Sequence, residues 1–326
     1  MPHSFSRRSL LRAGGSAAAA AALLATWPLR AQSPETVRIG YQRSSTLIAL
    51  LKADGSLEKA LAPLGVKISW HEFTSGLPLL EALNLGKIDV TADVADTVPV
   101  FAQAAGAKLV FIAEEAPSPS AQAILVPEGS PITDVAGLKG KKVAVTKGAG
   151  SHYLLLAALA KAGLTFKDIE PAYLTPADGR AAFVGGNVDA WVAWDPFLAT
   201  TQAQSRARIL ADGSGGLATY KRYYLTSEEF AVKGAPVIAL LFDQLKAKGE
   251  WVKANPQPAA AELAKLWGID PAAVEVANGR RSYKVGPVAR SGLSEQQKIA
   301  DAFLAENLLP RAVDTSAVVI WQPASQ

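Results

Sequence analysis

A short polar loop, Lys147-Gly148-Ala149-Gly150-Ser151-His152, leads into an apolar stretch typical of a helix, Tyr153–Ala160. Glycines let the backbone turn sharply and approach a ligand closely, and Ser151 is placed to cap the helix. Free N–H groups and the helix dipole at such an end attract anions. The loop therefore predicts an anion-binding site, although an ordinary strand-to-helix turn with Ser151 acting only as a cap fits the same residues.

Two nucleotide-binding motifs are excluded for this loop. A Walker A motif requires Gly-Lys-Ser/Thr at a fixed spacing, and a dinucleotide fingerprint requires three spaced glycines and a later acidic residue. The loop meets neither requirement. Its anion is therefore not predicted to be a nucleotide phosphate.

The chain lacks the residues that most catalytic and metal sites need. It has no cysteine, and its three histidines are His3, His71 and His152, the first of them near the N-terminus. Two remaining histidines cannot build a histidine-rich metal centre. Glu114 and Glu115 are adjacent, so on an extended strand their side chains would point apart rather than form an acid–base pair. We therefore expect a binding protein without metal or cofactor, not an enzyme.

Residues 1–31 have the layout of a secretory signal. Paired arginines, Arg7 and Arg8, precede an alanine-rich apolar stretch from Ala13 to about Ala25, and Ala31 is a small residue suited to cleavage. The paired arginines with a preceding serine and following leucines indicate the twin-arginine export route. A membrane-spanning helix is the alternative, but ~13 apolar residues fall well short of the ~20 that a span needs. We expect a periplasmic protein.

The basic charge of the chain comes from this segment. The chain has 33 Lys+Arg and 29 Asp+Glu, and four arginines but no acidic residue lie in residues 1–31, which leaves 29 charges of each sign. A neutral mature chain gives no support for a nucleic-acid or anionic-membrane partner. Its length predicts two domains.

Periodicity predicts alternating strands and helices. The C-terminal part, beyond Tyr224, is predicted to be mostly helical and to have no strands of its own, so that it returns to cover the first lobe. Strands are expected at Thr36–Tyr41, Val66–His71, Ile88–Ala92, Lys108–Ala113, Lys141–Thr146, Pro171–Leu174 and Val188–Val192, and helices at Thr46–Leu64, Gly76–Leu85, Thr97–Ala105, Ser151–Ala162, Asp178–Val184, Glu228–Phe230, Ala235–Asn255, Pro258–Trp267, Pro271–Asn278 and Ser294–Asn307.

The first and second halves repeat one pattern. Gly86-Lys87-Ile88-Asp89-Val90 and Gly186-Asn187-Val188-Asp189-Ala190 each follow an amphipathic helix and open an apolar strand. This βαβα order predicts an α/β fold with mainly parallel sheets in two similar lobes, although unrelated βα units could match by coincidence. We expect residues 36–120 and 222–326 in lobe 1 and residues 121–221 in lobe 2. The chain would cross between lobes near Pro117–Ala121 and Tyr220–Leu225, which would form a hinge.

Several segments, in order over residues 36–290, resemble the aliphatic sulfonate-binding proteins of ABC importers. Members of that family have the type II periplasmic-binding fold, with two lobes and two hinge crossings, and present alkanesulfonates to a membrane permease. The matching segments are Ile39-Gly40-Tyr41-Gln42, Glu72-Phe73-Thr74-Ser75-Gly76, Phe101-Ala102-Gln103-Ala104-Ala105-Gly106, Gly140–Val145 with His152–Leu155, Ala190-Trp191-Val192-Ala193-Trp194-Asp195-Pro196-Phe197 and Arg280-Arg281-Ser282-Tyr283.

The resemblance implies a set of ligand-binding residues. Sulfonates are permanently ionised, and backbone N–H groups and hydroxyls can satisfy their oxygens without a cation. The site would lie near Gly148, Gly150, Ser151 and His152, with Asp96 and Thr97 on the opposite wall; further candidates are Gln42, Ser44, Ser75, Gly76, Ser118, Ser120, Trp194 and Asp195.

Each assignment has a structural alternative. His152 is equally compatible with a solvent-exposed position, Trp194 with the core rather than an organic tail, and Asp96 and Asp195 with helix caps. Arg43 and Lys147 are expected to be solvated. Arg280 and Arg281 are expected to form surface or interdomain ion pairs.

Two departures from the family pattern leave the ligand open. Ala95-Asp96-Thr97-Val98-Pro99 stands where Gly-Asp-Ala-Pro-Pro is frequent, and Tyr220 stands where asparagine is expected. Taurine, a nitrate-like anion or a heterocycle are therefore alternative ligands, and sensing is an alternative role to transport. The desulfinase and pyrimidine-synthesising relatives use cysteine chemistry, which this chain lacks. We expect a monomer whose partners are the small anion and an inner-membrane ABC permease.

Overall fold

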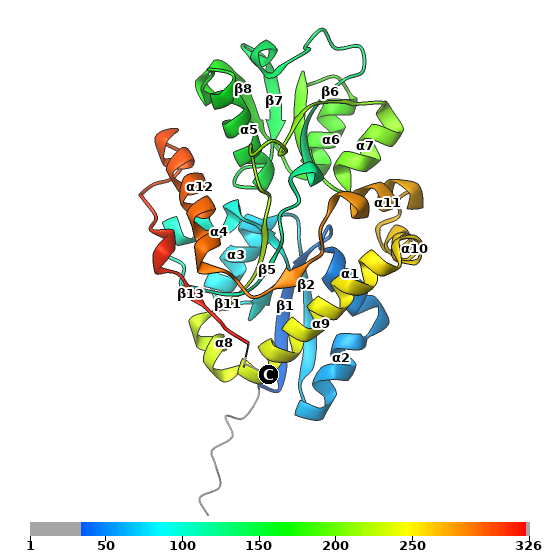
Figure 1. Cartoon of the computed structure of the whole chain (residues 1–326), viewed down its shortest axis with the longest axis vertical. Helices are drawn as coiled ribbons and strands as arrows, with labels where there is room; N and C mark the ends of the chain where they lie inside the picture. The colour runs from blue at the N-terminus through cyan, green and yellow to red at the C-terminus, as the bar shows by residue number, and fades with distance from the viewer. Residues whose placement is uncertain (1–33, 324–326) are drawn as a thin grey trace, which may run out of the picture. The chain divides into compact units, whose positions relative to one another are not determined.

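Two mixed β-sheets flanked by helices organise residues 34–323, the part of the chain that the computed structural model describes (Figure 1). The predicted signal segment lies outside these residues, which belong to one compact unit. The strands are β1 (Thr36–Gln42), β2 (Lys67–Phe73), β3 (Val90–Thr91), β4 (Val94–Ala95), β5 (Leu109–Glu115), β6 (Gln122–Val126), β7 (Lys142–Val145), β8 (Glu170–Tyr173), β9 (Ala190–Trp194), β10 (Arg208–Asp212), β11 (Arg222–Ser227), β12 (Val285–Gly286) and β13 (Val319–Ile320).

The helices follow the predicted spans closely, except that the helix Phe197–Ser205 was not predicted. The first predicted helix is divided at Gly55, because this residue adopts a left-handed conformation (φ 64°). The helices are α1 (Thr46–Asp54), α2 (Ser56–Leu61), α3 (Gly76–Asn84), α4 (Thr97–Ala104), α5 (Gly150–Lys161), α6 (Pro176–Val184), α7 (Phe197–Ser205), α8 (Glu228–Lys233), α9 (Ala235–Ala254), α10 (Pro256–Trp267), α11 (Pro271–Arg280) and α12 (Leu293–Ala305).

Each sheet contains one strand that pairs in parallel with both of its neighbours, and further strands that pair antiparallel. The first sheet has the order β12-β5-β11-β3-β1-β2, with β13 beside β5 and β4 beside β11, and the second has the order β10-β6-β9-β7-β8. Strand β1 pairs in parallel with β2 and β3, as β7 does with β8 and β9. Strand β11 is antiparallel to β3 and β5, and β6 is antiparallel to β9 and β10. The expectation of mainly parallel sheets is therefore wrong, because strands arriving from the other sheet enter in the opposite direction.

The repeat predicted from the sequence has a common structural cause. The Asp89 carboxylate accepts the N–H of Arg38 at 2.8 Å, and the Asp189 carboxylate accepts the N–H of Lys142 at 2.8 Å. In both cases the aspartate N–H donates back to the same residue of the central strand, again at 2.8 Å. Two equivalent βαβ units thus join helix to strand with the same pair of hydrogen bonds.

Two neighbouring segments connect the sheets. Residues 116–121 lead from β5 to β6, and residues 213–221 lead from β10 to β11. The Ser118 N–H donates to the Thr219 carbonyl at 3.0 Å, so the segments run side by side. The first crossing lies where it was predicted. The second lies earlier than Tyr220–Leu225, because residues from Arg222 onward already belong to β11.

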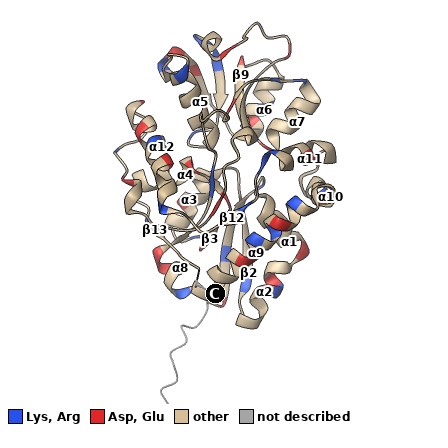
Figure 2. Ribbon diagram, viewed as in Figure 1, with Lys and Arg blue, Asp and Glu red and all other residues tan. Residues whose placement is uncertain are grey.

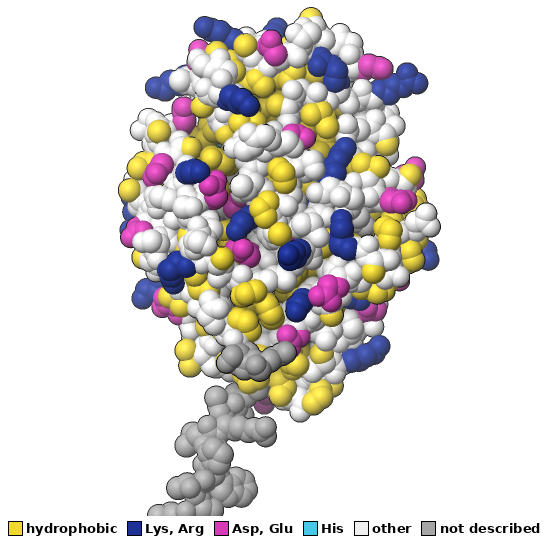
Figure 3. Space-filling model, viewed as in Figure 1, with side chains coloured by type: hydrophobic (Ala, Val, Ile, Leu, Met, Phe, Trp, Pro, Cys, Tyr) yellow, Lys and Arg dark blue, Asp and Glu magenta, His cyan; other side chains and the backbone are white. Residues whose placement is uncertain are grey.

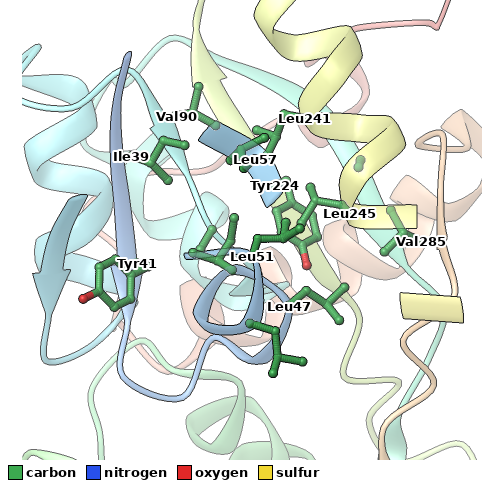
Figure 4. Packing of buried hydrophobic residues seen from close by; sticks show 14 of the residues in the cluster. Ile39, Tyr41, Leu47, Leu51, Leu57, Val90, Tyr224, Leu241, Leu245 and Val285 are labelled. Atoms are coloured by element: carbon green, nitrogen blue, oxygen red, sulfur yellow. The ribbon is translucent and has the colours of Figure 1, made fainter. Parts of the chain in front are cut away.

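The C-terminal part covers the first sheet but also adds to it. Side chains of α9, including Leu241 and Leu245, pack with Ile39, Leu47 and Tyr224 in the largest core cluster (Figure 4). The prediction of a strand-free C-terminal part is wrong, because the short strands β12 and β13 both pair with β5. Helix α12 also reaches beyond the first sheet, since Phe303 packs with Leu154 and Leu155 of α5.

Charges of both signs are intermixed over the helices (Figure 2) and on the visible face of the space-filling view (Figure 3). Within residues 34–323 no helix is long and apolar enough to cross a membrane. The same residues contain no group of three metal-ligating side chains.

Candidate functional site

The Gly148–Ser151 loop connects β7 to α5 and leaves hydrogen-bonding groups without partners. Gly148 is left-handed (φ 68°), and its N–H donates to Nδ1 of His152 at 3.1 Å. The N–H groups of Gly150 and Ser151, at the first turn of α5, have no partner among the described residues. The Ser151 hydroxyl is fully buried and also has no partner there. Because buried polar groups are normally hydrogen-bonded, this cluster is suited to receive an acceptor from outside the chain.

His152 holds this loop through the hydrogen bond that its ring accepts from the Gly148 N–H. Its ring is fully buried among Phe166, Tyr173 and Phe303, with ring centroids 4.9–5.6 Å away. Burial, with a smaller contribution from Lys147, lowers the pKa of His152 to about 3. The imidazole is therefore neutral, and since Nδ1 accepts a hydrogen bond, the proton resides on Nε2. The alternative of a solvent-exposed His152 is wrong.

The glycines of this loop allow close approach of residues from the first sheet and the hinge. A Cβ on Gly150 would lie 2.5 Å from the ring of Tyr220 and 3.0 Å from Cβ of Ala95. A Cβ on Gly148 would lie 2.7 Å from the side chain of Leu77. Side chains are not tolerated at such distances without displacement of the neighbour. Glycine is required here because two parts of the site meet.

Asp96 and Thr97 lie across from the Gly148–Ser151 loop, at the start of α4. Both are buried, and the Asp96 carboxylate accepts the Lys221 N–H at 3.0 Å. Burial raises the pKa of Asp96 to about 6. Asp96 occupies the N-cap position, but its side chain makes no capping hydrogen bond to α4. The expectation of a helix cap is wrong, because the carboxylate turns to the hinge segment instead.

Trp194 and Asp195 lie at the end of β9. The Trp194 indole N–H is 3.5 Å from Oγ of Ser44, and the ring meets Phe197 edge-on. The Asp195 carboxylate accepts the Ala199 N–H at 2.9 Å and lies 3.4 Å from the Arg280 guanidinium. Burial, opposed by Arg280, raises the pKa of Asp195 to about 6. Asp195 therefore satisfies the first turn of α7, as its capping alternative predicted, and Arg280 forms the expected ion pair.

The remaining candidate residues have no buried side-chain polar atom without a partner among the described residues. The Gln42 amide donates to the Asp93 carbonyl at 3.1 Å, and Ser118 Oγ accepts the Ser282 N–H at 3.0 Å. Ser75 precedes α3 without capping it. Gly76 and Ser120 are the last two: a Cβ on Gly76 would lie 2.7 Å from Val98, and Ser120 is half-buried in a short turn. Gln42 and Ser118 are thus engaged within the protein.

The sequence interpretation missed a buried charge network beneath the first sheet's carboxyl edge. Arg222 contacts Asp93 at 2.6 Å, and Arg281 contacts Asp93 at 3.2 Å and Glu115 at 2.6 Å. All four side chains are almost completely buried. The expectation of a surface or interdomain ion pair for Arg281 is wrong. Charged residues at the ends of apolar strands, such as Glu115 and Arg222, were the available signal.

Comparisons with known proteins identify relatives of this chain. A protein-family model described as NMT1/THI5 like matches residues 64–259. A protein of Escherichia coli (strain K12) with the provisional name aliphatic sulfonates-binding protein is 43% identical over 302 residues, which cover 92% of this chain and 93% of the relative.

Two solved structures are similar over most of their length. The alkanesulfonate-binding protein SsuA from Xanthomonas axonopodis pv. citri, bound to MOPS, has a TM-score of 0.83 at 39% identity and covers 89% of this chain and 99% of its own. The periplasmic aliphatic sulphonate binding protein SsuA from Escherichia coli has a TM-score of 0.79 at 42% identity and covers 88% and 98%. The predicted two-lobed periplasmic-binding fold with two crossings is confirmed.

Proposed function

We propose that this chain, which belongs to the NMT1/THI5-like family, captures an organic sulfonate outside the cytoplasm and delivers it to an ABC permease. Relatives at about 40% identity are named as binding proteins for aliphatic sulfonates, and one was solved with the sulfonate buffer MOPS. Such a protein binds and releases its ligand unchanged. The proposal is therefore a transport function and not an enzymatic one.

The observation that carries the proposal is the set of unpartnered donors at the start of α5. The Ser151 hydroxyl and the N–H groups of Gly150 and Ser151 are three donors within two residues. A sulfonate offers three acceptor oxygens and one delocalised negative charge, which the helix dipole favours. The ligand's organic part would then lie toward Trp194, whose ring is part of the apolar cluster that also holds Tyr220 and Ala95.

Closure of the two lobes would complete the site. The close distances at Gly148 and Gly150 correspond to a closed state, in which Leu77, Ala95 and Tyr220 cover the loop. A ligand that contacts both sides binds this state better than an open one and shifts the population toward it. The hinge would be residues 116–121 and 213–221, and we propose lobe 1 as residues 36–120 plus 222–326 and lobe 2 as residues 121–221.

The remaining parts of the proposal concern location and partners. The paired arginines Arg7 and Arg8 support export to the periplasm by the twin-arginine route. The closed form would act as a monomer and dock on the permease in the inner membrane. The export route is testable. If the twin-arginine route is used, replacement of both arginines by lysine should retain the precursor in the cytoplasm.

The ligand class is tested by calorimetry on the purified protein with butane-1-sulfonate, butanoate and butylamine. These probes share a four-carbon chain, so they isolate the head group. We expect saturable binding of the sulfonate, weaker binding of the carboxylate and none of the amine. Binding of the amine or of a neutral heterocycle, with no response to any sulfonate, would overturn the assignment.

A further inference from the structure

A cavity lies beside Phe197, which packs against the same apolar cluster as Trp194 and Ala149. It has a volume of about 220 Å³. This is smaller than the roughly 300–1,000 Å³ of complete small-molecule sites, so it fits one end of a ligand rather than a whole molecule. The cavity, which we call the distal pocket, is lined by Arg43, Ser44, Ala177, Arg180, Pro196, Phe197, Thr200, Trp267 and Ile269.

The distal pocket and the proposed sulfonate site both adjoin Trp194. Phe197 lines the pocket and meets Trp194 edge-on at a centroid distance of 5.9 Å. Ser44 lines it too and accepts from the Trp194 indole. Trp194, Phe197 and Ala149 belong to one hydrophobic cluster, and Ala149 is in the loop that precedes Ser151. A ligand held at Ser151 with its carbon chain packed on Trp194 would be directed toward the distal pocket.

The charged side chains that line the distal pocket are both positive. Arg43 and Arg180 are its only charged lining residues, and no carboxylate lines it. The nearby Asp195 carboxylate is already engaged by Arg280 and the Ala199 N–H. Neither Arg43 nor Arg180 forms an ion pair within residues 34–323.

Both guanidinium groups keep free donors. Arg43 donates to the Trp267 carbonyl at 3.1 Å, and Arg180 donates to the Gln204 side chain. The Nε of Arg180 is buried and has no partner among the described residues. A guanidinium has five N–H donors in a planar fork that matches carboxylate or sulfonate oxygens.

We propose that the distal pocket receives a second anionic group at the far end of the ligand. The preferred substrate class is then an organic sulfonate whose carbon chain ends in a carboxylate or a second sulfonate. This inference rests on the proposed sulfonate-binding function and specifies its substrate. Ser151 would hold one end of the ligand, Trp194 would pack on its carbon chain, and Arg180 with Arg43 would hold the other end.

The test is a calorimetric comparison of matched pairs, alkane-1-sulfonates against α,ω-alkanedisulfonates, from ethane to hexane. For at least one chain length we expect the disulfonate to bind at least about tenfold more tightly, as one charge-assisted hydrogen bond would give. Arg180→Gln should reduce this preference to less than about threefold and leave monosulfonate affinity within about twofold. Lys167→Gln, which removes an exposed charge of the same lobe, is the matched control and should change neither.

The outcomes separate this inference from the function on which it rests. Tight monosulfonate binding without a preference for any disulfonate overturns the distal-pocket inference alone, as does an equal loss of both ligands in Arg180→Gln. Failure of every sulfonate to bind overturns the proposed function and the inference together. An unchanged melting temperature of Arg180→Gln excludes misfolding as the cause of lost preference, and Arg43→Gln provides a second variant at the same pocket.

Discussion

The loops that follow β1 and β7 occupy equivalent places in the two sheets but use their hydroxyl groups differently. After β1, Ser45 Oγ accepts the Gln42 N–H at 3.2 Å, and the Thr46 hydroxyl accepts from the Arg281 guanidinium at 3.3 Å. After β7, the buried Ser151 hydroxyl has no partner among the described residues. The same βα unit thus satisfies its hydroxyl groups by folding in one sheet and leaves a hydroxyl for a ligand in the other.

The largest expected effect is a loss of stability in the loop after β1, whose hydroxyl groups already have hydrogen-bond partners. Arg281→Met should cost about 3–5 kcal/mol of unfolding free energy, because it leaves buried Asp93 and Glu115 with too little compensating charge. Urea unfolding measures this cost. Arg290→Met, at an exposed arginine that donates only to backbone carbonyls, is the control and should cost less than about 1 kcal/mol. Equal, small losses in both variants would show that the network does not hold the first loop.

Exchange of serine for alanine in the two loops should separate stability from binding. Ser151→Ala removes a donor to a charged ligand, so sulfonate affinity should fall by about 1.5–3 kcal/mol, while stability stays unchanged or rises. Ser45→Ala should do the reverse, because the Gln42 N–H loses its acceptor. Calorimetry and urea unfolding on both variants measure the two quantities. A Ser151→Ala variant that binds normally would remove the difference between the loops.

Addition of one methyl group at Gly150 should hinder closure. Its Cβ would lie 2.5 Å from Tyr220, and overpacking of this kind costs about 1–3 kcal/mol. We expect weaker binding and a smaller ligand-induced decrease in the radius of gyration measured by X-ray scattering. Gly129→Ala, whose Cβ would meet nothing within 4 Å, is the control. Normal compaction and affinity in Gly150→Ala would argue against a closed site at this contact.

The smallest expected effect is a pH dependence that comes from Asp96. Burial raises its pKa to about 6, opposed by the Lys221 N–H group and by Arg222. The folded state therefore holds more protons than the unfolded state between about pH 4 and 6, so the contribution of Asp96 to stability falls as pH rises through this range. A sulfonate nearby would raise the pKa of Asp96 further.

Sulfonate affinity should accordingly increase by up to about fivefold from pH 7 to pH 5.5, and Asp96→Asn should reduce the increase. Calorimetry at the two pH values measures the change. His152, with a pKa of about 3, does not titrate in this interval, whereas Asp195, whose pKa is also about 6, does. A pH dependence that persists unchanged in Asp96→Asn would place the titrating group elsewhere.

The sequence predicted the elements whose periodicity is clear and missed those that lack it. The repeat around Asp89 and Asp189 could be found because it is local and recurs in both halves. Strand β6, Gln122–Val126, is buried at every residue, so it shows no alternation of polar and apolar positions. Strands β12 and β13 have two residues each, which is too short for any periodic signal.

The candidate site likewise contains features that local sequence predicts and features that depend on distant residues. The composition of the Gly148–Ser151 loop indicated an anion site, because glycine, serine and a helix start act locally. The burial of His152 depends on Phe303, and that of Arg281 depends on Glu115, which is 166 residues away in the chain. Contacts over such separations are set by the packing of the sheets and are not visible in local patterns.

The most direct test of the account is a crystal structure of the protein with a bound alkanesulfonate. We predict sulfonate oxygens within about 3.2 Å of the Ser151 hydroxyl and of the N–H groups of Gly150 and Ser151, with the carbon chain directed toward Trp194. A sulfonate bound at the equivalent loop after β1, or elsewhere with Ser151 still without a partner, would contradict the account.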